Sequence, residues 1–531
     1  MRQRREYAIL GWQCTRFRRT DGFATAHVTC PRPKRECMSH RLGGRRVDSS
    51  PRKGSAATAA PRWSVLAVIG VAQLMVVLDI TIVNIALPSA QQELGFGVEN
   101  RQWVITAYSL AFGSLLLLGG RLSDRVGVRL TLVIGLLGFA VASAVGGAAG
   151  NFTVLVAARA AQGVFAAILA PAALSGLNVT FARPDERAKA FAVYSAIAAS
   201  GAVLGLLLGG ALTQWLSWRW CLYINLVFAI PAALAAVVLV RAPAIRHDRT
   251  RLDWPGVITA VGGMFCLVFG LSRAESDGWS APVTVALLTT SAVLIATFVI
   301  VELRAPAPLL PLRIVTDRNR GGSYLTIALT FCAMFAAFLF LTFFMQTDLG
   351  YSPLATGVAF LPMAAGIGLA AALANTQLVP RFGPRPLIPT GMAAAAAGMA
   401  WLGQLDSNAT YAHDVLGPII LLGIGMGLAF SPAVATATSA VRPEDTGVAS
   451  AMVSTSQQIG GSVGTAALST IFAAALERYL NAHHPATPTV ATAAAIHGYT
   501  VAFHIACGLF VVGAILTALI LRSGRLQDSH S

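Results

Sequence analysis

Long apolar runs, separated by short polar segments, fill the chain from residue 64 to residue 521. Each run is close to the ~20 residues that an α-helix needs to cross the hydrocarbon core of a bilayer. The pattern therefore predicts fourteen membrane-spanning helices. They cover residues 64–87, 102–121, 130–149, 153–178, 190–213, 220–240, 255–272, 282–302, 322–346, 354–378, 387–404, 415–439, 447–475 and 498–521.

Arginine and lysine give an independent check on that count, because short cytoplasmic loops carry an excess of them. If the N-terminus is cytoplasmic, 34 of the 39 Lys and Arg residues fall in the tails and loops on that side. Only Arg101, Arg219, Arg273 and Arg478 fall in loops on the other side, and Arg159 lies within a span. This asymmetry predicts that both termini are cytoplasmic.

The composition excludes a water-soluble, multidomain protein. Hydrophobic residues make up 55% of the 531 residues and charged residues only 12%, against roughly 25% charged residues in a typical soluble protein. The net charge is +16, but residues 1–62 alone hold 15 Lys and Arg against four Asp and Glu. Because most of the positive charge precedes the first span, we expect no nucleic-acid partner; the expected surroundings are the lipid bilayer.

The basic segment before the first span contains no apolar stretch of the kind found in secretory signal peptides. Two interpretations stay open. Residues 1–63 are either a disordered cytoplasmic extension, or the product of a start codon upstream of the true start at Met38, in which case residues 1–37 are not translated.

Two stretches of the chain are similar at a constant offset of 259 residues. Arg183-Pro-Asp-Glu is followed by Gly201 and Gly205, and Arg442-Pro-Glu-Asp is followed by Gly460 and Gly464. Equivalent positions are eight spans apart, so two helices are inserted between two parallel six-helix repeats. The predicted fold is all-α, with fourteen transmembrane helices arranged 6+2+6. Its parts are residues 64–240 (first bundle), 241–320 (inserted helices with linkers), 321–521 (second bundle) and 522–531 (cytoplasmic tail).

Residues 120–129 read Gly-Arg-Leu-Ser-Asp-Arg-Val-Gly-Val-Arg and fall in the turn between the second and third spans. An aspartate there can pair with an arginine or cap a helix N-terminus, and a glycine allows a tight turn. The segment resembles the signature loop of the major facilitator superfamily, which implies a gating latch between two halves of the protein. Its members here are Gly120, Asp124, Arg125, Gly127 and Arg129. A solvated basic loop is the alternative.

The first span contains Leu-Asp-Ile-Thr-Ile-Val-Asn-Ile-Ala-Leu-Pro at residues 78–88, which resembles the first span of the fourteen-helix drug/proton antiporters of that superfamily. Its Asp79 lies deep within the span, and a carboxylate there marks an ion or substrate path by default. Arg159, in the fourth span, lies at about the same depth, ~12–14 Å from the outer ends of the two helices. We therefore expect Asp79 and Arg159 to meet and to couple transport to protons. A structural ion pair is the alternative.

The fifth span carries four glycines, and three of them share one helix face, which allows a second backbone to approach closely. They are Gly201, Gly205, Gly209 and Gly210. The spacing is similar to the antiporter motif of this span, except that Leu206 stands where the family has proline.

Polar and aromatic side chains in the spans are candidates for a substrate cavity. A polar run in the thirteenth span and phenylalanines in the ninth would suit varied hydrophobic or cationic ligands. The candidates are Asn84, Gln162, Phe335, Phe338, Ser454, Gln457 and Gln458. For the phenylalanines, contact with lipid is the competing interpretation.

No phosphate-binding loop is present, because none of the three lysines precedes Ser or Thr. We therefore expect no ATP hydrolysis by this chain. No His, Asp and Glu cluster with metal-ligand spacing and no nucleophile elbow appears in the sequence, so we expect no enzyme activity, no metal and no cofactor, and the proton motive force as the energy source. The resemblance implies a monomeric multi-pass exporter of hydrophobic or weakly cationic drugs in a bacterial plasma membrane. Export of an endogenous metabolite (a self-made antibiotic, a siderophore or an amino acid) and a non-transporting membrane receptor are the alternatives.

Overall fold

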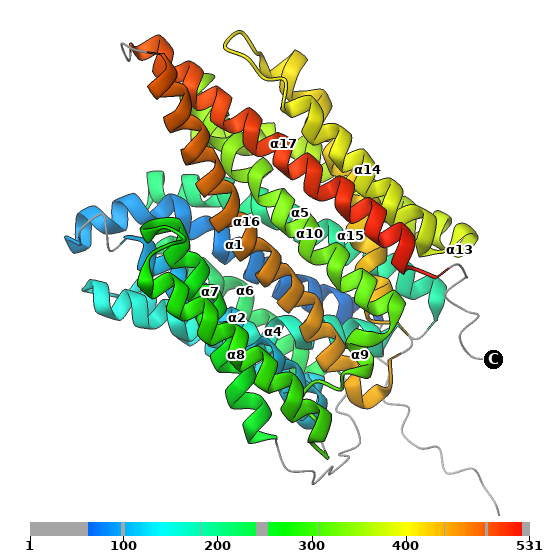
Figure 1. The fold of residues 1–531 in the computed structure, drawn as a ribbon. Coiled ribbons are helices and arrows are strands. Elements are labelled where there is room, and N and C mark those ends of the chain that lie inside the picture. The colour runs from blue at the N-terminus through cyan, green and yellow to red at the C-terminus, as the bar shows by residue number, and fades with distance from the viewer. Residues whose placement is uncertain are drawn as a thin grey trace, which may run out of the picture. The chain divides into compact units, whose positions relative to one another are not determined.

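The computed structural model describes residues 62–96, 101–181, 183–240, 253–306, 308–439, 441–483 and 487–522. Residues 1–61 of the expected N-terminal extension and most of the C-terminal tail lie outside these residues, whereas residues 62 and 63 begin the first helix. Within the described part, every regular element is a helix (Figure 1).

The first six long helices are α1 (Arg62–Leu94), α2 (Arg101–Val126), α3 (Val128–Gly147), α4 (Phe152–Thr180), α5 (Pro184–Trp215) and α6 (Trp220–Leu239). Two more follow, α7 (Trp254–Asp277) and α8 (Pro282–Arg304). The remaining α-helices are α9 (Arg313–Thr316), α10 (Arg318–Phe343), α11 (Pro353–Ala359), α12 (Leu361–Leu373), α13 (Val379–Phe382), α14 (Pro384–Leu402), α15 (Leu416–Ala437), α16 (Thr446–Ala482) and α17 (Pro488–Ile520). Short π-helical turns extend three of them, at Phe344–Asp348, Ala374–Leu378 and Tyr411–Val415, and a 3-10 turn at Pro443–Asp445 precedes α16.

Twelve helical segments of the described chain are long and apolar enough to cross a membrane. The helices α5 and α14 are not among the twelve, although they coincide with the predicted spans 190–213 and 387–404. Residues 190–215 and 386–402 of these two helices contain no charged side chain. The chain is therefore a multi-pass, all-helical membrane protein, and the count of fourteen spans stays a prediction.

The same order of helix pairing occurs twice along the chain. In the first set, α1–α6, helix α1 packs against α5 and α6, α2 against α4, and α3 against α4 and α6. In the second set, α10, α12 and α14–α17, helix α10 packs against α16 and α17, α12 against α15, and α14 against α15 and α17. The helices α7 and α8 pack against each other, and α7 also contacts α2 and α16 (Figure 1).

The glycines that are similar in sequence occupy equivalent places in the two sets. Gly205 of α5 lies so close to α1 that an added Cβ would overlap the side chain of Thr81. Gly464 of α16 faces α10 in the same way, and its Cβ would overlap the backbone oxygen of Cys332. Gly201 and Gly209 also face α1, whereas a Cβ at Gly210 would meet no atom within 4 Å. Three of the four glycines in α5 are therefore packing positions.

The two sets meet where α2 ends and α16 begins, which we call the Asp124 end of the bundle. A Cβ added to Gly120 of α2 would lie 2.6 Å from the carbonyl oxygen of Gly447 in α16. Between α5 and α15, the Ser195 hydroxyl donates to Ser431 Oγ at 2.8 Å. The opposite end, where α1 finishes near Glu93, we call the Glu93 end.

Gly464→Ala is expected to lower the melting temperature of the detergent-purified protein, because the new methyl group forces α16 away from α10. Overpacking of this kind costs about 1–3 kcal/mol. Gly461→Ala, on the same helix, is the matched control, because a Cβ there meets no atom within 4 Å. Thermal unfolding followed by fluorescence should separate the two variants, and equal melting temperatures would contradict the packing described.

Candidate functional site

A fully buried ion pair lies inside the first set of helices. Asp79 of α1 has no solvent-exposed surface and Arg159 of α4 is 2% exposed. Arg159 Nη1 donates to Asp79 Oδ2 at 2.5 Å. Asp79 and Arg159, which were expected to meet because they lie at similar depths in their helices, are thus in direct contact.

Amide and hydroxyl groups from three helices complete the surroundings of the pair. The second oxygen of Asp79, Oδ1, accepts from Asn225 Nδ2 of α6 at 2.7 Å and from Gln162 Nε2 of α4 at 3.0 Å. Gln162 Nε2 also donates to Ser143 Oγ of α3 at 2.7 Å, and Gln162 Oε1 accepts from Arg159 Nη1 at 2.8 Å. Both carboxylate oxygens therefore accept hydrogen bonds from donors that converge from different helices.

Helix α2 contacts the arginine from the other side. Arg159 Nε donates to the carbonyl oxygen of Val104 at 3.2 Å. The guanidinium lies over the ring of Tyr108, 4.6 Å from its centroid. Backbone and aromatic groups of α2 thus compensate the part of the positive charge that faces away from Asp79.

Such a network satisfies the severe requirements of a charge in a low-dielectric interior. Removing two ions from water costs several kcal/mol each, and only good geometry with additional hydrogen bonds repays that cost. Five helices of the first set contribute to this site. The site therefore lies within the first set and not between the two sets.

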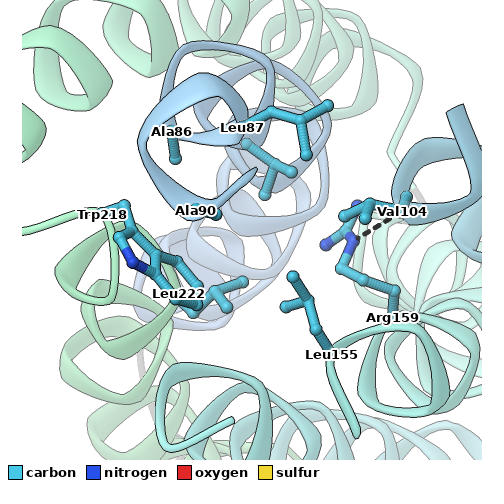
Figure 2. A pocket seen from close by; sticks show the side chains of 9 residues that line it. Ala86, Leu87, Ala90, Val104, Leu155, Arg159, Trp218 and Leu222 are labelled. Atoms are coloured by element: carbon cyan, nitrogen blue, oxygen red, sulfur yellow. Dashed lines mark hydrogen bonds between the residues drawn. The ribbon is translucent and has the colours of Figure 1, made fainter. Parts of the chain in front are cut away.

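An apolar crevice extends from this network toward the Glu93 end, between α1, α2, α4 and α6 (Figure 2). Ala86 and Ala90 of α1 lie on one side, and Leu222 of α6 is also part of the wall. Arg159 lines its inner end, where its hydrogen bond to Val104 is drawn. The space is sufficient for about one water molecule.

Glu93 connects the end of α1 to the start of α6. Its carboxylate accepts from Trp218 Nε1 at 2.6 Å and from Arg219 Nη2 at 2.8 Å. The hydrogen bond from Arg219, and next that from Trp218, lower the pKa of Glu93 from its usual value. Trp218 is only 3% exposed and lines the crevice, while the Glu93 side chain is 50% exposed.

The segment at residues 120–129, which is the end of α2 and the start of α3 with a turn at Gly127, joins the two sets at the Asp124 end. Asp124 Oδ1 and Oδ2 accept from the backbone N–H groups of Gly447 and Val448, at 2.6 and 3.1 Å. These N–H groups belong to the first turn of α16, where a helix has unpaired donors and a partial positive charge. Gly127 has a positive φ of 91° at the sharp turn into α3. Arg125 and Arg129 are partly buried in the same segment.

A second ion pair supports the start of α16. Asp445, which is 3% exposed, accepts from Arg313 Nη2 of α9 at 2.6 Å. The turn that presents Gly447 to Asp124 is therefore tied to the segment that precedes α10.

The candidate cavity residues lie in several places. Gln162 belongs to the buried network, and Phe338 stacks on Phe360 with ring centroids 5.1 Å apart inside the second set. Ser454 is buried, whereas Gln457 and Gln458 are partly buried. Gln458 lies against Gly113 of α2, where a Cβ would be 2.8 Å from its Cγ. The side chains of Asn84 and Phe335 lie outside the described part of the structure.

Sequence reasoning missed four members of the network: Val104, Tyr108, Ser143 and Asn225. Asn225 is a polar residue in an apolar span and could have been singled out on that ground. Ser143 and the backbone of Val104 carry no such signal, because serine is common in membrane helices and every residue has a carbonyl group.

Comparison with known proteins places this geometry in context. The sequence profile described as Major Facilitator Superfamily matches residues 69–465. The chain is 47% identical over 465 residues to the puromycin resistance protein pur8 of Streptomyces alboniger, covering 87% of this chain and 92% of that protein. It is 37% identical over 402 residues to the cephamycin export protein CmcT of Amycolatopsis lactamdurans, covering 75% and 83%.

The fold is also similar to that of a solved transporter. The proton:xylose symporter XylE aligns with a TM-score of 0.60 and 17% identity, covering 88% of this chain and 97% of that chain. At this level of identity the likeness concerns the fold alone.

Arg159→Met is expected to destabilise the protein by about 3–5 kcal/mol, because Asp79 is left as a buried charge without its partner. Adding Asp79→Asn to the same chain should restore part of the stability, since no net charge then remains in the site. Chemical unfolding of the purified variants measures both effects.

Arg273→Met provides the control for the loss of an arginine as such. Arg273 pairs with Asp277 at 3.0 Å, but both side chains are more than a third exposed, and exposed pairs contribute about 0–1 kcal/mol. If the double variant is no more stable than Arg159→Met alone, the two charges are not energetically coupled.

Proposed function

The chain belongs to the major facilitator superfamily, and we propose that it exports hydrophobic or weakly cationic antibiotics and other drugs in exchange for protons. It is a transporter and not an enzyme. The names of its relatives support antibiotics as substrates, because they denote resistance to puromycin and export of cephamycin. One observation carries the proton coupling: a carboxylate without exposed surface inside the first set, held by donors from several helices.

Protonation of Asp79 conflicts with the arrangement that surrounds it. Oδ2 accepts from Arg159, and Oδ1 accepts from both Gln162 and Asn225. A protonated carboxyl group carries an O–H donor, so at least one of these donors must move away when a proton binds. The neutral carboxyl group also releases Arg159 from its counter-ion. Proton binding is thereby linked to a rearrangement of α4 and α6 relative to α1.

The Asp124 end supplies the gate in this mechanism. Asp124 joins α2 of the first set to the N-terminus of α16 in the second set. Separation of the two sets at this end breaks both hydrogen bonds. The carboxylate of Asp124 and the N–H groups of α16 are then exposed, and water molecules replace the lost hydrogen-bond partners. The closed interface described here is one state of an alternating-access cycle, and no cofactor is required besides the proton motive force.

The membrane arrangement we propose has fourteen spans in a 6+2+6 order. The repeated pairing of helices supports it, and α5 and α14 supply the two spans beyond the twelve. The first bundle is residues 64–240, the inserted pair with its linkers 241–320 and the second bundle 321–521. A monomer suffices, since one chain contains both bundles.

The charge distribution supports an orientation with the Asp124 end in the cytoplasm of a bacterial cell. Arg121, Arg125 and Arg129 lie at that end, as do Arg381 and Arg385. Both termini are then cytoplasmic, and the Glu93 end faces outward. The protein lies in the plasma membrane.

Export of an endogenous natural product is the second candidate. The cephamycin export protein among the relatives favours it, because that name denotes an exported compound and not only resistance. Susceptibility of a pump-deficient host to puromycin, cephamycin, tetracenomycin C and lincomycin, with and without the chain, identifies which relative's compound it accepts. A receptor without transport activity would change none of these.

Asp79→Asn is expected to abolish uphill export driven by a pH gradient in proteoliposomes while downhill exchange of the same compound continues. The amide keeps the shape of the side chain but cannot take up a proton. Asp277→Asn is the matched control, because Asp277 lies in an exposed ion pair and its variant should transport normally. Uphill export that persists in Asp79→Asn would refute the coupling role.

Asp124→Ala is expected to open the Asp124 end. Hydrogen bonds to a charged acceptor contribute about 1.5–3 kcal/mol each, so losing two should shift the closed population by roughly a hundredfold or more. Cysteines at positions 195 and 431 report closure through the rate of disulfide formation, since the two serine oxygens are 2.8 Å apart. Glu444→Ala, an exposed carboxylate beside the same helix start, should leave that rate unchanged, and an equal rate in Asp124→Ala would contradict the latch.

A further inference from the structure

We propose that protons reach Asp79 through the crevice inside the first set of helices, separately from the path that the substrate takes between the two sets. The inference rests on the proposed proton exchange and names its route. It assigns a role to residues of α1 and α6 that lie outside the charge network.

One face of α1 leads from the carboxylate to the Glu93 end. Asp79, Val83, Ala86, Ala90 and Glu93 follow at spacings of four, three, four and three residues, which keeps them on one side of the helix. Alanine occupies two of these positions, and its short side chain leaves the space that bulkier residues would fill. The crevice therefore begins one helix turn beyond Asp79.

The opposite walls of the crevice come from α2, α4 and α6. Val104, Leu155 and Leu222 line it, and the side chain of Arg159 lines its inner end (Figure 2). Arg159 in turn contacts Asp79 Oδ2. A water molecule at the inner end would thus lie next to the arginine that holds the carboxylate.

The outer part of the crevice contains a tryptophan whose indole is held by a hydrogen bond to a carboxylate. Trp218 lines the space and donates its indole N–H to Glu93. The Glu93 side chain is half exposed. Release of this hydrogen bond would let the indole move and admit water, so Glu93 and Trp218 form the entrance.

The apolar walls explain why protons do not leak through such a route continuously. Apolar cavities of this size stay dry unless polar groups hold the water. Water therefore enters only in short-lived openings, which suits a path that must carry single protons. A space for about one water molecule excludes drug-sized compounds, so the substrate cannot use this route.

The test uses one substitution that fills the crevice and one that widens it. Proton flux is measured with a pH-sensitive dye inside proteoliposomes. Ala86→Leu fills the space and is expected to lower inward proton flux coupled to puromycin export severalfold. Leu222→Ala widens it and is expected to produce proton flux without any exported compound, and adding Asp79→Asn should remove that flux. Ala157→Leu, on the exposed face of α4, is the control and should match the parent protein.

Chemical access provides a second measurement that does not depend on transport. In a cysteine-free background, Ala90→Cys should react with a membrane-impermeant thiosulfonate added outside only during openings of the crevice, so Leu222→Ala should speed the reaction, and puromycin should not protect it. The proposal is overturned if Ala86→Leu and Leu222→Ala both behave like Ala157→Leu, or if puromycin blocks the reaction at position 90. If Asp79→Asn itself retains uphill export, the proposed function fails, whereas a normal Asp79 effect with inert crevice variants removes only the route.

Discussion

A buried negative charge on Asp79, compensated within a few ångströms by Arg159, is the constraint on which the first set of helices depends. In a low-dielectric interior an unpaired charge would destabilise the protein by several kcal/mol. The carboxylate therefore requires donors in fixed places, and Gln162, Ser143 and Asn225 supply or orient them from α4, α3 and α6. Any change in the charge of this site alters contacts between helices, which is the property a coupling site needs.

The carboxylate of Asp124 also accepts hydrogen bonds from another helix, but it connects the two sets of helices instead of lying within one of them. It binds backbone N–H groups of another helix at the boundary between the two sets, where its side chain is partly buried. Its bonds can break without leaving a buried charge, so this contact suits a gate that opens and closes. Helix α2 carries Asp124 at one end and contributes Val104 and Tyr108 to the buried network nearer the other. One rigid helix thus touches both the proposed proton site and the proposed gate.

Particular residues show how far sequence reasoning reached. Asp79 and Arg159 were predicted to meet because a charge in an apolar span demands a partner and only one lay at the same depth. The glycines at 201, 205, 460 and 464 were predicted to be equivalent, and they face α1 and α10 in the same manner. Gln162 was expected at a substrate cavity, but it lies in the charge network. Its position differs because the charge-bearing faces of α1 and α4 turn toward α3 and α6.

The sequence by itself determined the membrane class, the helices and the two charges that must pair, because hydropathy, length and the cost of burying ions act along or within single segments. Only the tertiary structure decided that the pair lies inside the first set, that Asp124 caps α16, and that small side chains on α1 leave a crevice beside Arg159. These features depend on how helices distant in sequence rotate and pack against one another, and packing combines many weak contacts that no single segment encodes.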